Sequence, residues 1–274
     1  MLDETAEANM GPGVIPQPSS APALLETLPF EIQRMILSQA PTFEALRALV
    51  HASPKLHRVY VQNRLPILRD LVEQTFDGFV VDVNVAYETG TNEFQQTRSE
   101  SRLLEEIGAY EDRLTTRHAI QLDLVENMSL EYIIQLVRFH RSVIEPLAER
   151  YAAWALAALS SGTSPQSHPQ SEVERRRIQR ALYRLEVFCN LCGFRGEGRS
   201  APVYIGTSIE RLYVLNIFPA WQIEEILCVH AFAQHSYSVI FEQIDWDLDG
   251  PRQPGHLSVQ DLSLPSPPTG RKHV

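Results

Sequence analysis

The chain has 274 residues, a formal net charge of −10 and 44% hydrophobic residues. This acidic balance argues against nucleic acid as a partner, since binding to the phosphate backbone requires Lys and Arg concentrated on one face. The longest unbroken apolar segment spans residues 151–159, and a membrane-spanning helix needs about 20 residues, so no membrane partner is expected. Three cysteines and an acidic N-terminus without an apolar segment predict a reducing location, cytoplasmic or nuclear.

Prolines mark the segments that are expected to remain unfolded. Four of the 18 prolines lie in the first 22 residues and five follow Gly250. Two more lie in the polar segment 160–171. Such segments bury too little apolar surface to offset the entropy of ordering them. We therefore predict disordered tails at 1–22 and 250–274, a flexible linker at 160–171, an N-terminal module at 23–65, and helical regions at 66–159 and 172–249.

The N-terminal module is predicted to contain three short helices. Pro29 suits the first turn of a helix, and the negative charge of Glu31 is favourable there. The second helix is expected to begin at the Pro41–Thr42 break and the third at Ser53, which precedes a proline. The side chains expected to face inward are Ile32, Met35 and Ile36 on the first helix, Leu46, Leu49 and Val50 on the second, and Leu56, Val59 and Tyr60 on the third.

The order of these residues resembles an F-box. The pattern is Leu25-x-x-Leu28-Pro29-x-Glu31-Ile32-x-x-x-Ile36-Leu37, followed by Leu46 and Leu49 and a Ser-x-x-Leu start of the third helix. It is most similar to the F-box-like proteins of filamentous fungi, in which a helical C-terminal region follows. The resemblance implies docking on a Skp-family adaptor, connection through it to a cullin, and recruitment of a protein substrate that the sequence does not identify.

The same resemblance implies which side chains meet the adaptor. They are Leu28, Pro29, Glu31, Ile32, Ile36, Leu37, Leu46, Leu49 and Leu56. Many F-boxes carry a Trp near the position of Leu56, and this smaller anchor would weaken docking by about 1–2 kcal/mol. An alternative explains the same pattern as an amphipathic helix that begins at a proline. In that case the N-terminal helices pack internally, and the protein is a non-enzymatic structural or interaction protein.

The remaining elements are predicted to be helices. Residues 79–85 are β-branched and alternating but have no convincing strand partner. Helices are expected to begin at Ser129 and near Pro219, and Ser171 with Glu174 forms a capping-box pattern that opens another helix. The predicted fold class is therefore mainly α, with an N-terminal three-helix F-box-like module followed by an irregular α-helical domain.

Cys189, Cys192, Cys228 and His230 are weak candidates for a zinc site. The first two lie on an apolar helical stripe, where a free cysteine behaves as a small hydrophobic side chain. His230 likewise lies on an apolar stripe, that of Ile223, Ile226 and Leu227, and is expected to be a hydrogen-bonded core histidine. A core interpretation is therefore favoured, and neither a metal nor another cofactor is expected.

Five arginines form the basic cluster of the chain: Arg175, Arg176, Arg177, Arg180 and Arg184. They could bind phosphate or an acidic partner, but a solvated helix face flanked by Glu172 and Glu174 is the favoured interpretation. Patterns typical of catalytic or nucleotide-binding sites are not found in the sequence, so no catalytic residue is assigned and the protein is not expected to be an enzyme.

Overall fold

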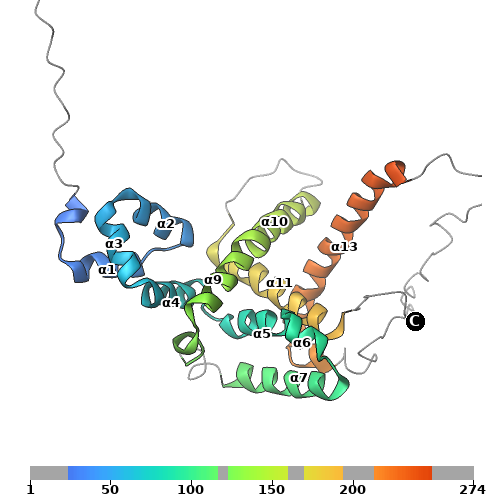
Figure 1. Ribbon diagram of the computed structural model, residues 1–274. Helices are drawn as coiled ribbons and strands as arrows, with labels where there is room; N and C mark the ends of the chain where they lie inside the picture. Colours follow the sequence, from blue (N-terminus) through green and yellow to red (C-terminus); the bar gives the residue numbers. More distant parts are fainter. Residues whose placement is uncertain (1–23, 117–122, 160–169, 194–212, 249–274) are drawn as a thin grey trace, which may run out of the picture.

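A computed structural model describes residues 24–116, 123–159, 170–193 and 213–248. The predicted tails, and the predicted linker up to residue 169, lie outside these ranges. The described residues are mainly α-helical and contain no strand, which confirms the predicted fold class. The elements are η1 Leu24–Thr27, α1 Phe30–Ser38, α2 Phe43–Ala52, α3 Pro54–Gln62, α4 Arg64–Thr75, α5 Val80–Gly90, α6 Asn92–Gln96, α7 Glu100–Thr115, α9 Leu130–Phe139, η2 His140–Ile144, α10 Glu145–Leu159, α11 Glu172–Cys192 and α13 Ala220–Leu248 (Figure 1).

Most helix starts are fixed by short-range capping. The Thr42 side chain accepts a hydrogen bond from the Ala45 amide, and the Ser53 hydroxyl accepts bonds from the two amides that follow Pro54. Ser129 caps α9 in the same way. Ser171 and Glu174 form both hydrogen bonds of a capping box at the start of α11. The four predicted caps are therefore confirmed.

Helix α5 occupies the centre of the fold. Its β-branched residues lie between 0% and 3% exposed, and it packs chiefly against α11, with further contacts to α6 and α7. A turn connects it to α4, and in this turn Gly78 has φ of 83°, a left-handed conformation that suits glycine. The alternating run 79–85 is thus part of a helix that is buried on nearly every side, which explains its apolar composition without a sheet.

Helices α9 and α10 form one helical rod interrupted by a π-helical turn, η2. Pro146 lies in the first turn of α10, where its missing N–H is tolerated. Ile133, Leu136 and His140 are buried and lie three and four residues apart, on one side of this rod. The His140 ring stands within 3.1 Å of the Tyr183 hydroxyl on α11, so this turn is fixed against the centre of the fold.

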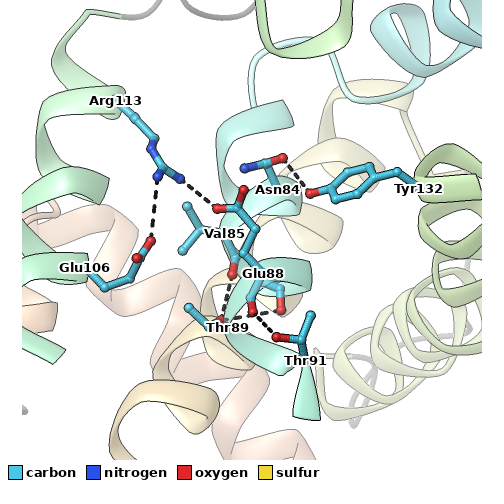
Figure 2. Close-up of polar contacts among 9 residues, drawn as sticks. Asn84, Val85, Glu88, Thr89, Thr91, Glu106, Arg113 and Tyr132 are labelled. Atoms are coloured by element: carbon cyan, nitrogen blue, oxygen red, sulfur yellow. Dashed lines mark hydrogen bonds and ion pairs between the residues drawn. The ribbon is translucent and has the colours of Figure 1, made fainter. Parts of the chain in front are cut away.

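Polar contacts around α5 join it to its neighbours (Figure 2). The Tyr132 hydroxyl of α9 donates a 2.6 Å hydrogen bond to Asn84. Arg113 of α7 lies 3.0 Å from Glu88 and 3.8 Å from Glu106. Burial raises the pKa of Glu106, and the nearby Arg113 opposes that shift. These contacts fix the positions of α7 and α9 around the central helix.

Candidate docking surface

Helix α1 turns a different side to the core than its apolar pattern predicted. Its buried residues are Gln33, Leu37 and Ser38. Ile32 is 41% exposed and Met35 is 60% exposed. The predicted inward face of α1 was therefore wrong.

The rotation of α1 has a physical cause. The Gln33 amide is buried and donates a 2.9 Å hydrogen bond to the Leu25 carbonyl of η1. The Gln74 amide of α4 donates a 2.9 Å bond to the Ser38 carbonyl at the other end of α1. Because these bonds, together with the buried Leu37, hold the side of α1 that carries Gln33, Leu37 and Ser38 inward, the side at Ile32 and Met35 faces solvent.

Four apolar residues in and just before α1 define the surface that we call the α1 patch: Leu28, Ile32, Met35 and Ile36. Within α1 the spacing of three and one residues places Ile32, Met35 and Ile36 on one side of the helix, and Leu28 precedes its N-cap. Leu28 and Ile36 are half-buried, and the other two are exposed. This spacing is that of a helix whose apolar residues enter a partner's groove.

Of the other residues implied by the F-box resemblance, Pro29 and Glu31 are exposed and Leu49 is half-buried. Pro29 is the N-cap of α1 and precedes its first turn. Ile36 and Leu49 retain part of their surface and can contribute at its edge.

The remaining three residues of that set belong to the interior. Leu37 is 0% exposed, Leu46 is 4% and Leu56 is 1%. Leu37 and Leu46 are part of the same core cluster as Ile67 and Leu71 of α4. Because they already pack inside this chain, they have no free surface to offer to a partner. Among the residues that the resemblance implies, exposed surface remains on the α1 patch, Pro29, Glu31 and Leu49.

The arginine cluster of α11 is engaged by acids of the same chain, and one member is buried. Arg177 and Arg180 lie 2.8 Å and 3.0 Å from the carboxylate of Glu225 on α13. Arg175 and Arg176 pair with Glu172. Four of the five therefore pair with acids of the same chain and keep between 21% and 56% of their side-chain surface exposed, in keeping with the solvated helix face.

Arg184 departs from that prediction because it is 1% exposed. Its Nε lies 3.0 Å from Asp82 of α5, and its Nη1 donates a 2.7 Å bond to Gln222 of α13. The Tyr110 hydroxyl of α7 donates to the same Asp82 carboxylate. Burial, followed by the charge of Asp82, raises the pKa of Tyr110 well above its usual value. These side chains join four helices and are shielded from solvent, so they serve the fold rather than a substrate.

The weak zinc candidates do not gather. Among the described residues, no group of three or more His, Cys, Asp or Glu side chains is arranged to hold a metal ion. Cys192 is buried as predicted, but Cys189 is exposed. His230 is also exposed, because the buried side of α13 runs through Ile226 and Val229. The prediction of a core position was wrong for Cys189 and His230.

Comparisons with known proteins identify no family for this chain. A scan of protein-family models, a search of curated proteins and a search of solved structures each gave no match to this chain. The F-box resemblance therefore depends on the N-terminal residues alone. Within the described part of the chain, no helix is both long enough and apolar enough to cross a membrane.

Proposed function

We propose that the protein is a non-catalytic adaptor whose N-terminal helices dock on a Skp-family protein through the α1 patch. Through that protein it would join a cullin-based ubiquitin ligase, and its helical remainder would recruit a protein substrate. The observation that carries the proposal is the outward apolar side of α1, where Ile32 and Met35 are 41% and 60% exposed. An apolar group of this kind on a monomer is typical of an interaction site.

The outward side of α1 also supports the proposal over a role in internal packing alone. If the N-terminal helices served only the fold, the residues after Arg64 would cover Ile32 and its neighbours. Instead, α4 covers the opposite side of α1, at Leu37. The helix therefore has one side for its own chain and one side available to a partner.

The experiment is co-expression with a Skp-family adaptor, followed by pull-down of the full chain. The variant is Ile32→Asp with Met35→Asp, because both positions are exposed and their substitution should leave the fold intact. Placing two carboxylates in an apolar groove costs several kcal/mol, so we expect binding to be lost. The control is Val173→Asp on α11, a residue that is 69% exposed and lies outside the patch.

Three results decide the matter. Binding by the wild type and the control, but not by the helical double variant, would support the adaptor. Equal binding by all three would place the contact elsewhere on the chain. A soluble wild type that never binds would refute the proposal.

A second candidate is a structural or interaction protein outside the ubiquitin system. The burial of Leu37, Leu46 and Leu56 in the chain's own interior favours it, as does the ion pair between Glu44 of α2 and Arg141 of η2. These contacts attach the N-terminal module to the helical remainder. Failure of the wild type to bind any Skp-family adaptor would select this candidate.

A further inference from the structure

The C-terminal half of α13 carries exposed apolar side chains at helical spacing. Tyr237 is 64% exposed, Ile240 51%, Phe241 63% and Ile244 37%. Separations of three, one and three residues place them on one side of the helix, which we call the α13 stripe. In Figure 1 the far end of α13 stands clear of α10 and α11.

The α13 stripe continues the buried side of the same helix. Ile226 and Val229 are 3% and 1% exposed, and Ala233 follows at the next turn. Tyr237, Ile240 and Ile244 then recur with the same period. The apolar side of α13 thus extends beyond the helices that cover its first half, and such a contiguous surface is typical of an interface.

We propose that the α13 stripe pairs with the α13 stripe of a second copy of this chain. The two helices would run antiparallel around a two-fold axis between Ile240 and Phe241. Tyr237 of each copy then lies opposite Ile244 of the other, and Ile240 lies opposite Phe241. An interface of this kind is self-complementary and closes as a dimer. The inference does not depend on the proposed adaptor function.

The charge pattern favours a second copy over other occupants. Between residues 231 and 244 the only formally charged side chain is Glu242, although the whole chain carries −10. Two copies of an acidic chain repel each other least where charges are sparse. A membrane surface would instead be met by Lys and Arg beside the apolar residues, and this segment has neither.

The size of the surface predicts a weak dimer. Tyr and Phe side chains bury about 150–250 Å² each when fully covered, so the exposed parts of the four side chains amount to about 400 Å² per copy. A total of about 800 Å² lies in the range of transient interfaces. We therefore expect the dimer to form and dissociate with protein concentration.

The first experiment measures the mass of the full chain by sedimentation over a range of concentrations. We expect the mass to rise with concentration toward twice the chain mass of 31.1 kDa. Ile240→Asp should raise the dissociation constant at least about 30-fold, as expected for a central interface residue. The matched control is Leu227→Asp, which is 53% exposed on another side of the same helix and should dimerise as the wild type does.

The second experiment tests the antiparallel register by oxidative cross-linking. Tyr237→Cys combined with Ile244→Cys should give a disulfide-linked dimer. Each single variant should cross-link no more than the wild type, because seven residues separate the like positions by about 10 Å along the axis. A wild type that stays monomeric at its highest soluble concentration would overturn the proposal. So would equal dimerisation of the wild type and Ile240→Asp, or cross-linking by either single variant.

Discussion

Replacing Arg184 by methionine should destabilise the protein because it leaves a carboxylate buried without its cation. Arg184 and Asp82 are both 1% exposed, with 3.0 Å between Nε and Oδ1. Methionine preserves part of the aliphatic volume but leaves Asp82 with the Tyr110 hydroxyl as its hydrogen-bond donor. Removing one member of a buried ion pair costs about 3–5 kcal/mol. For a domain of this size the loss corresponds to a fall in Tm of roughly 6–20 °C.

Urea unfolding followed by circular dichroism measures this cost. Arg176→Met is the matched control on the same helix, since Arg176 is 38% exposed and pairs with Glu172 and Asp77 at the surface. It should change the free energy of unfolding by less than about 1 kcal/mol. Asp82→Leu combined with Arg184→Met removes both charges and should recover most of the lost stability. If Arg184→Met costs no more than Arg176→Met, the interpretation of a desolvated pair is wrong.

Three further predictions concern the core, a helix cap and the response to acid. Leu37→Ala should cost about 2–5 kcal/mol in urea unfolding because its side chain is fully buried, whereas the exposed Ile32→Ala should cost less than about 1 kcal/mol. Ser171→Ala should lower the free energy of unfolding by about 1 kcal/mol through loss of the capping box at α11, a change that thermal unfolding would detect. Hydrogen bonding with His140 lowers the pKa of Glu145 below 4.5. The Glu145 carboxylate therefore stabilises the fold fully above pH 4.5, and this stabilisation is lost as the pH falls through the lowered pKa. The difference in urea midpoint between wild type and Glu145→Gln should shrink on acidification, and it would stay constant if the contact were absent.

Helix starts could be predicted from the sequence because the forces that set them act over a few residues. Thr42, Ser53, Ser129 and Ser171 each accept a hydrogen bond from an amide two or three positions ahead. The mainly α class followed from the same local information. The apolar run at residues 79–85 was ambiguous, because a helix buried on all sides and a strand both favour β-branched residues.

The orientation of α1 could not be predicted, because distant residues determine it. The apolar pattern placed Ile32 and Met35 inside, but the carbonyl of Leu25 and the side chain of Gln74 hold the Gln33 and Ser38 side inward. An apolar pattern reports which side is apolar, not which neighbour covers it.

Arg184 was missed for a similar reason, since its partner Asp82 lies 102 residues earlier in the chain. One signal was present in the sequence. Asp82 is the only charged residue of the run at 79–85, and a single carboxylate there requires a buried cation or hydrogen-bond donors. A basic residue within an apolar helical pattern, such as Arg184 between Leu182 and Leu185, is the matching signal.

The orientation of α1 bears on how the N-terminal module can work. Leu37 and Leu46 join the module to the rest of the chain, so a substitution there would reduce folding and binding together and would say nothing about docking. Ile32 and Met35 contribute little to the interior, so their loss should affect a partner without affecting the fold. The docking side and the packing side of α1 can therefore be tested separately. Loss of Skp-family binding by the variant at Ile32 and Met35, at an unchanged free energy of unfolding, would distinguish an adaptor from a protein in which α1 only completes the core.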